Sequence, residues 1–278
     1  MDASLTLNNL AGRLACPQCG GPLAPEFSCK ACASSYQPNG GVLDLRPPEI
    51  RGRAEERDWS KHWSDEFQKS NSQRFFSFYR KAVFARTVRH FLDGYFPQEG
   101  VFVEAGAGTS ETSMLVSKHD GKRTLVALDL IREVLALSHP VMDVRVAGDI
   151  FRLPFQTNSL DGIWNVGVME HFTHDRIDAI LREFHRVLRP GGRVILLWPA
   201  VFSIPQRMLR ILEYFINLRR SQDDIFRFHP DEITQIRSIQ EGREVLGRNG
   251  FSTVMIDPGL YSLMAFETLV GEKPGPAQ

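Results

Sequence analysis

The chain has few cysteines and no excess of charge of either sign. Only 4 of its 278 residues are cysteine, and all four lie between positions 16 and 32. Secreted disulfide scaffolds spread their cysteines along the chain, so this clustering favours a metal site and a reducing, cytoplasmic environment. Basic and acidic residues number 33 each, which excludes a general electrostatic attraction to nucleic acid or to an anionic membrane.

Long apolar runs are also missing. No stretch approaches the ~20 consecutive apolar residues that a membrane-spanning helix needs. The N-terminus has no apolar run behind a basic start, so we do not expect a secretory signal. Hydrophobic residues make up 42% of the chain and charged residues 24%, which is typical of a globular protein with one or two domains.

The cysteines form two CxxC pairs, Cys16–Cys19 and Cys29–Cys32, separated by nine residues. Zn²⁺ prefers four soft donors in a tetrahedron, and each CxxC turn presents two thiolates to one ion. Four cysteines leave no open coordination position, so the zinc is expected to be structural rather than catalytic. Two disulfides or free thiols are the alternatives.

The chain divides into three regions that differ in residue composition and in hydrophobic pattern. Residues 1–48 are rich in Pro, Gly and Cys and predict a small zinc ribbon that ends at the Pro47-Pro48 pair. Residues 49–98 predict a helical linker or cap. From 99 to 278, short apolar runs alternate with amphipathic segments, interrupted by a helical insertion at about 200–240. This alternation predicts an α/β, Rossmann-like, doubly wound sheet with helices on both faces.

A glycine-rich turn follows the first expected strand of this region. The strand Val101–Val103 leads into Glu-Ala-Gly-Ala-Gly-Thr-Ser at 104–110. Small residues at a strand end let the backbone approach a ligand, and the helix expected next offers free N–H groups. Glu111 stands where a dinucleotide fingerprint requires glycine. The acidic Glu104 suits a ligand with a cationic amine better than a pyrophosphate.

Several further segments follow in order. Asp129 ends an apolar strand 25 residues after Glu104, and Ala-Gly-Asp-Ile follows at 147–150. Next come LDGIWNV at 160–166, GVMEHF at 167–172 and LREFHRVLRPGGRVILLWP at 181–199. Together these segments resemble class I S-adenosylmethionine-dependent methyltransferases, in the broad small-molecule branch. The resemblance covers residues 100–270, and Ser110 departs from it because the family usually has glycine there.

The resemblance implies a seven-stranded sheet, S-adenosylmethionine as cofactor and a set of residues that hold it. Glu104 would face the cationic amine, Asp129 the ribose hydroxyls and Asp149 the adenine amino group, with Ile150 or Phe151 beside the ring. The full set expected to contact the cofactor is Glu104, Gly106, Ala107, Gly108, Asp129, Leu130, Asp149, Ile150, Asn165 and Val166. The segment 14–47 is similar to short zinc ribbons that precede or partner bacterial methyltransferases.

Each of these assignments has a structural alternative. Asp129 can cap the following helix, Asp149 can be a turn residue, and Asp161 is expected to pair with nearby basic residues. His171 is the candidate general base, because it ends the fourth strand of the expected sheet and a histidine titrates near neutrality. It can equally pack against a loop. His174 and His229 are poorer candidates.

The acceptor is expected to be a small molecule, apolar or lipid-linked. Residues 204–220 alternate apolar side chains with four arginines, which is typical of a basic amphipathic helix that touches lipid or covers an apolar substrate. Packing on the sheet or a dimer contact are the other interpretations.

Two other functions compete with this one. An RNA base methyltransferase would use the zinc ribbon to grip RNA, but the first 50 residues hold few basic groups, so nucleic acid is the less favoured partner. The last alternative is a non-catalytic, methyltransferase-like scaffold. Since ribbon and sheet are expected to be separate units, loss of zinc should loosen residues 1–45 and leave cofactor affinity largely intact.

Overall fold

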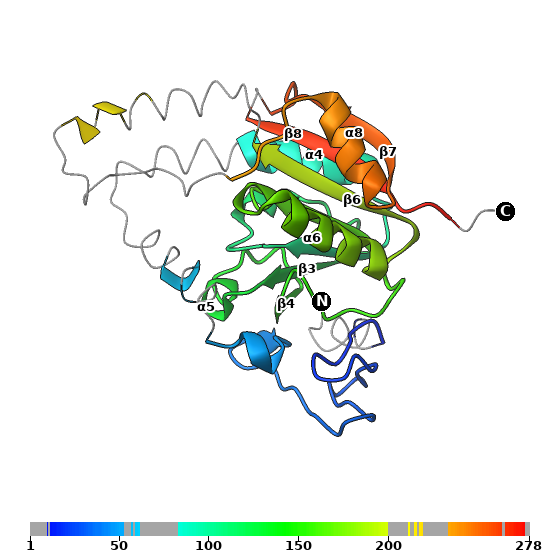
Figure 1. Cartoon of the computed structure of the whole chain (residues 1–278). Helices are drawn as coiled ribbons and strands as arrows, with labels where there is room; N and C mark the ends of the chain where they lie inside the picture. Colours follow the sequence, from blue (N-terminus) through cyan, green and yellow to red (C-terminus); the bar gives the residue numbers. More distant parts are fainter. Residues whose placement is uncertain are drawn as a thin grey trace.

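The computed structural model describes residues 10, 12–52, 57, 59–61, 83–199, 211, 214, 215, 217, 218, 233–262 and 265–275 (Figure 1). The strands are β1 (Val42–Asp44), β2 (Gly100–Ala105), β3 (Arg123–Asp129), β4 (Val144–Ala147), β5 (Leu160–Val166), β6 (Leu188–Pro199), β7 (Ser252–Asp257) and β8 (Phe266–Glu272). The helices are η1 (Pro48–Ile50), α4 (Ala85–Tyr95), η3 (Glu111–Ser113), α5 (Arg132–Leu135), η4 (Met169–His171), α6 (His174–Val187) and α8 (Ile239–Arg248).

These strands form one mixed sheet in the order β1-β4-β3-β2-β5-β6-β8-β7. The first six strands in this order pair in parallel, and β8 is antiparallel to both of its neighbours. Strand order reverses between β2 and β5, so the carboxyl ends of these two strands mark the switch point where doubly wound sheets bind ligands. The predicted seven-stranded α/β fold is confirmed, and β1 adds an eighth strand from the N-terminal segment.

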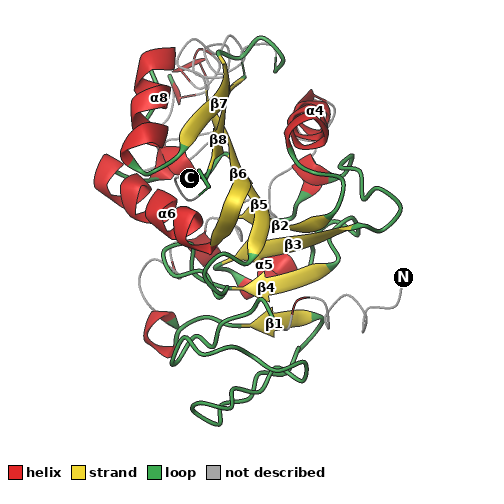
Figure 2. Cartoon of the chain, turned by 90° about the vertical axis from the view of Figure 1, so that its right-hand side faces the viewer, coloured by secondary structure: helices red, strands yellow, loops and turns green. Residues whose placement is uncertain are grey.

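Helices cover both faces of the sheet (Figure 2). The apolar side of α6, through Ile177, Ile180 and Phe184, packs in one core cluster with α8 and with apolar residues of the N-terminal segment. Val88, Phe91 and Leu92 of α4 pack in a second cluster on the opposite face. Two buried layers on one sheet are the arrangement that the alternating apolar runs predict.

The N-terminal segment is part of this body. β1 pairs in parallel with β4, and the Ala15 N–H donates to the carbonyl of Pro154 at 3.0 Å. Leu14, Leu23 and Leu43 are buried in the same cluster as strand residues of the main sheet. The boundary predicted at residue 48 therefore falls between segments that share a sheet and a core.

Asp161 joins three parts of the chain. Its carboxylate accepts hydrogen bonds from Arg13 at 3.1 Å, from Arg189 at 2.6 Å and from the Val101 N–H at 2.8 Å. The carboxylate lies near the amino end of β5, so it stabilises the edge of the sheet opposite to the ligand-binding edge. The ion pairs expected for Asp161 are present, and they are structural.

The helix expected after the glycine-rich turn differs from the structure, and most of the expected helical insertion cannot be compared with it. This helix is only the single 3-10 turn η3, and the Ser113 hydroxyl at its end contacts Glu104 and Trp164. Most of the insertion at 200–240, including His229, lies outside the described residues. None of the helices in the described part of the chain is long and apolar enough to cross a membrane.

Candidate cofactor site and metal centre

The candidate cofactor residues lie at the carboxyl ends of four adjacent strands. β4, β3, β2 and β5 are neighbours in that order, and each contributes the residues that end it or follow it. Glu104 to Gly108 come from β2, Asp129 and Leu130 from β3, Asp149 and Ile150 from the turn after β4, and Asn165 and Val166 from β5. The sheet thus brings the whole predicted set to one edge, although their contacts with a cofactor stay predictions.

The turn after β2 requires a residue without a side chain at Gly106. Its φ is +75°, and a Cβ atom there would lie 2.7 Å from Cγ2 of Val168. The N–H groups of Gly106 and Ala107 both donate to the carbonyl of Leu128, which fixes the turn against β3. Ser110 keeps the left-handed conformation, with φ +53°, that a glycine at this position would adopt without strain.

Glu104 is buried, with 2% of its surface exposed. One carboxylate oxygen accepts a hydrogen bond from Ser113 Oγ at 2.8 Å, and the other has no hydrogen-bond partner among the described residues. Burial raises the pKa of Glu104 to about 7, against the opposing effects of Ser113, Ser110 and Trp164. An unpaired buried oxygen is costly without a donor, so this carboxylate fits a ligand that carries a cationic amine.

Asp129 connects the two loops beside it. Its carboxylate accepts from the Gly108 N–H at 2.8 Å and from the Ile131 N–H at 2.9 Å. Burial raises the pKa of this carboxyl group, while these backbone hydrogen bonds oppose the rise. A carboxylate has about four acceptor positions, so two such bonds leave capacity for ribose hydroxyls. This geometry is compatible with both interpretations of Asp129, in which it either stabilises the neighbouring loops or binds the ribose.

The remaining polar candidates differ in their side-chain hydrogen bonding, since Asp149 has a partner and Asn165 has none in the described part of the chain. Asp149 accepts a hydrogen bond from the Phe151 N–H at 3.0 Å, which is the turn role considered for it, and both Asp149 and Ile150 are half-buried. Asn165 is fully buried, and neither its side-chain oxygen nor its nitrogen has a hydrogen-bond partner in the described part of the chain. Such an amide needs a polar partner, which a bound ligand can supply.

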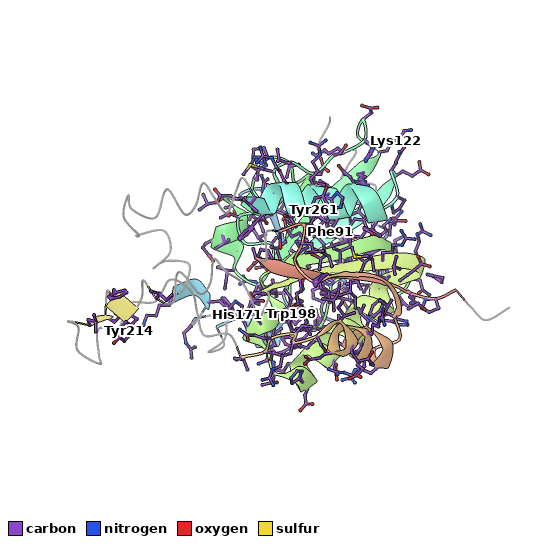
Figure 3. The ribbon with its side chains drawn as sticks, turned by 90° about the horizontal axis from the view of Figure 1, so that it is seen from above. Phe91, Lys122, His171, Trp198, Tyr214 and Tyr261 are labelled. Atoms are coloured by element: carbon purple, nitrogen blue, oxygen red, sulfur yellow. The ribbon has the colours of Figure 1, made fainter. Side chains whose placement is uncertain are left out.

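His171 lies in η4, directly after β5, and its Nε2 is 3.9 Å from Glu170 Oε1. The ring packs edge-on against Trp59 from the helical cap region, with ring centroids 5.2 Å apart. Figure 3 shows His171 on the same side of the molecule as Tyr214, which projects away from the sheet. His174 is exposed at the start of α6. The Trp59 ring and the Glu170 carboxylate therefore both lie beside the candidate base.

The four cysteines form one cluster, whose sulfur atoms all lie within 4.8 Å of one another. Cys16 and Cys32 are 3.6 Å apart and Cys19 and Cys29 are 3.4 Å apart, Sγ to Sγ, so neither pair is a disulfide. Four Zn–S bonds of ~2.3 Å place tetrahedral sulfurs roughly 3.8 Å apart, which is close to these distances. The donor set and the geometry both fit a structural zinc ion.

Polar neighbours support the cysteine cluster. The Tyr36 hydroxyl lies 3.2 Å from Cys16 Sγ, and the Ser34 hydroxyl lies 3.3 Å from Cys32 Sγ. These hydroxyl groups lie within hydrogen-bonding distance of two of the four expected zinc ligands, as polar neighbours of metal-bound groups commonly do.

Sequence reasoning missed three residues that contact the candidate cofactor site. Ser113 and Trp164 stand beside Glu104, and Arg46 reaches the carbonyl of Leu130 from the N-terminal segment at 3.3 Å. Ser113 lies three residues after the glycine-rich motif at 104–110, so the motif alone does not include it. Nothing in the sequence places Arg46 near position 130, because that contact depends on the pairing of β1 with β4.

Comparison with known proteins bears on this geometry. Residues 103–196 match the family described as a methyltransferase domain. The chain is 34% identical over 125 residues to a ubiquinone/menaquinone biosynthesis C-methyltransferase of Rubrivivax gelatinosus, covering 44% of this chain and 47% of that protein. It is 30% identical over 93 residues to a malonyl-[acyl-carrier protein] O-methyltransferase of Herminiimonas arsenicoxydans, covering 34% and 35%. These matches thus span half or less of each relative's length.

A solved structure shows the same fold. The magnesium protoporphyrin IX methyltransferase of Synechocystis PCC 6803, determined with bound SAH, superposes with a TM-score of 0.51 at 14% identity, over 78% of this chain and 95% of that one. At this identity the likeness concerns the fold alone. The match to the family model covers the glycine-rich turn, Asp129, Asp149 and Asn165, which are the parts that the sheet gathers at one edge.

Proposed function

We propose that the protein is a class I S-adenosylmethionine-dependent methyltransferase that transfers the cofactor's methyl group to a small apolar acceptor, and the match of residues 103–196 to the methyltransferase-domain family supports this. The observation that carries this proposal is the unpaired buried oxygen of Glu104 beside the glycine-rich turn. A decayed, non-catalytic scaffold has no need to keep a buried carboxylate without a partner, because the cost of burial is then uncompensated.

Bound S-adenosylmethionine would supply a methyl group that is already electrophilic. The protein's part is to bind, to orient and to exclude water. Glu104 would hold the cationic amine, Asp129 the ribose hydroxyls and Asp149 the adenine amino group, with Ile150 against the ring. His171 would accept the proton that an acceptor oxygen or carbon releases, and Glu170 beside it would stabilise the charged imidazole.

An apolar acceptor is supported by an exposed row of apolar side chains. Ile211, Tyr214, Phe215 and Leu218 recur at three- and four-residue steps, and 58–65% of each is exposed. Arginines at 207, 210, 219 and 220 flank this row in the sequence. We propose that segment 204–220 contacts a lipid surface that contains the acceptor, because apolar and basic residues together favour anionic membranes. A cytoplasmic site of action belongs to the same proposal.

RNA is the less favoured acceptor. Two of the basic groups in the N-terminal segment are engaged in ion pairs, Arg13 with Asp161 and Arg46 with Asp44. A group held in such a pair is less available to neutralise phosphate, on which RNA binding depends.

Calorimetry with S-adenosylmethionine tests the enzyme proposal first. A folded, zinc-loaded protein should bind it, and absence of binding contradicts the proposal. Transfer of a labelled methyl group into organic-solvent extracts, compared with transfer into total RNA, then identifies the acceptor class. Label in RNA alone would contradict an apolar acceptor.

Vesicle sedimentation tests the lipid contact. Phe215→Asp should lower binding to anionic vesicles, whereas Leu137→Asp should not, because Leu137 is as exposed, at 60%, but lies in another part of the chain. Equal vesicle binding by wild-type protein and by both variants would exclude segment 204–220 as the contact.

A further inference from the structure

The N-terminal segment supplies the strand that borders the adenosine end of the proposed cofactor site. In the register of the sheet, Asp44 of β1 lies beside Ala147 of β4, and Ala147 lies beside Asp129 of β3. The Leu45 N–H continues this pairing by donating to the carbonyl of Ala147 at 2.9 Å. Residues of the same N-terminal segment that holds the cysteine cluster therefore reach the strand end that carries Asp129.

Arg46 extends this contact to the loop itself. Its guanidinium forms a two-pronged ion pair with Asp44, with nitrogen–oxygen distances of 2.9 and 2.8 Å, and its Nη1 donates to the carbonyl of Leu130 at 3.3 Å. Only 8% of Arg46 is exposed. A planar guanidinium fixed by a paired carboxylate has a defined direction, so it holds its third partner in place.

A second arginine also joins these two segments, but here the donor lies next to the loop and the N-terminal segment carries the acceptor. Arg132, just after the loop, donates to the carbonyl of Asn39 at 2.8 Å, in the turn that leads into β1. The segment 129–132 is thus held by the N-terminal segment at both ends. It is also held by hydrogen bonds to Asp129 from the Gly108 N–H at 2.8 Å and from the Gly148 N–H at 2.9 Å.

We propose that Arg46 is a positioning residue for cofactor binding, and that it couples the N-terminal zinc segment to the loop expected to hold the ribose. Without Arg46, the Leu130 carbonyl loses a donor and Asp44 loses its buried partner, so the loop samples other positions. A cofactor must then pay to order it, which weakens binding. The expectation that loss of zinc leaves cofactor affinity intact is replaced by the opposite one. This inference rests on the proposed function.

The test measures the affinity for S-adenosylhomocysteine by calorimetry in zinc-loaded, full-length variants. Arg46→Ala should weaken binding about tenfold, and Arg46→Lys should give most of that loss, because an ammonium cannot form the two-pronged pair. Arg51→Ala is the matched control. Arg51 also approaches Asp44, at 3.7 Å, but it is half exposed, and it should change affinity less than about twofold.

Hydrogen exchange separates positioning from a general loss of structure. In Arg46→Ala, amides of segment 129–132 should exchange faster, while those of β6 should keep wild-type protection. Wild-type affinity in Arg46→Ala overturns the inference and leaves the proposed function standing. Uniformly faster exchange, including β6, overturns it as well, because the arginine would then be a general stabiliser. If wild-type protein itself fails to bind the ligand, the proposed function fails.

Discussion

Ser113 donates a hydrogen bond to Glu104 at 2.8 Å inside the protein, yet burial still raises the pKa of Glu104 to about 7. The polar side chains beside Glu104, namely Ser113, Ser110 and Trp164, therefore do not compensate for the loss of water around this carboxylate. A bound cation would complete the compensation, since an opposite charge within a few ångströms favours the ionised form. The pair thus links protonation of Glu104 to ligand binding.

This link predicts a pH dependence that Glu104→Gln removes. The folded-state pKa lies above the ordinary value of 4.5, so the stability that the proton contributes is complete below pH 4.5 and is lost as the pH rises through 7. The gap corresponds to roughly 3 kcal/mol. Urea unfolding at about pH 5.5 and about pH 8 should show wild type losing stability relative to Glu104→Gln at the higher pH.

Cofactor binding should change in the opposite direction. Affinity for S-adenosylmethionine should rise as the pH increases through 7 in wild type, because the ionised carboxylate binds the amine, and it should be weak and flat in Glu104→Gln. Glu267→Gln is the control. Burial also raises the pKa of Glu267 to about 7, but Glu267 lies on β8, so this variant should alter stability and keep the pH dependence of binding. A flat binding profile in wild type would contradict the role given to Glu104.

Ser110 gives a prediction about backbone strain. Its left-handed φ of +53° costs a residue with a Cβ about 1 kcal/mol, and glycine avoids this cost. Ser110→Gly should therefore stabilise the protein by about 0.5–1 kcal/mol in urea unfolding. Ser110→Ala keeps the Cβ atom and should give no gain. If the glycine and alanine variants were equally stable, the strain at this position would be negligible.

Zinc removal should destabilise more than the first 50 residues. Cys16 is buried in the core cluster that contains Leu14 and Leu43, and metal binding to such a segment is coupled to its folding. Cys16→Ser should lower the zinc content from about one ion per chain to nearly none. The melting temperature of the whole protein should fall with it.

Metal analysis and calorimetric melting of matched variants check this expectation. Lys30→Ala changes an exposed residue inside the second CxxC and should keep both the zinc and the melting temperature. Retention of wild-type zinc content by Cys16→Ser would exclude the four-cysteine site.

The strands and their order along the chain can be predicted from the sequence because short apolar runs mark them locally. Strand ends such as Glu104 and Asp129 are marked by apolar runs that stop at an acidic residue, and parallel strands bring those ends to one edge. The division between ribbon and sheet at residue 48 stays a prediction, although β1 lies on the ribbon side of it and pairs with the sheet. β1 is three residues long, and its pairing with β4 depends on neighbours about a hundred positions away, which no local pattern encodes.

Side-chain partners were harder to predict than strands. The alternation of apolar residues places Asp161 on a strand, but it does not say that Arg13 and Arg189 converge on it. The same holds for Arg46 and Leu130. Contacts between residues far apart in the sequence follow from the register of the sheet, and the register is set by packing of the whole core.

His171 provides the prediction that distinguishes a chemical role from a packing role. If it accepts the acceptor's proton, His171→Ala should lower kcat by about 10²–10⁴-fold, and affinity for S-adenosylmethionine should stay near wild type. His171→Asn, which keeps a planar polar group beside Trp59, should be as inactive, because asparagine does not titrate in this range. Labelled methyl transfer to the acceptor identified in the extracts measures both variants.

His174→Ala is the matched control, three residues further on and exposed at the start of α6, and it should keep full activity. A packing role gives a different pattern. His171→Asn would then retain much of the wild-type rate, and His171→Ala would lose thermal stability along with activity. An activity that survives in His171→Asn would mean that the acceptor needs no base from this position, and that binding and orientation by the strand ends are sufficient for transfer.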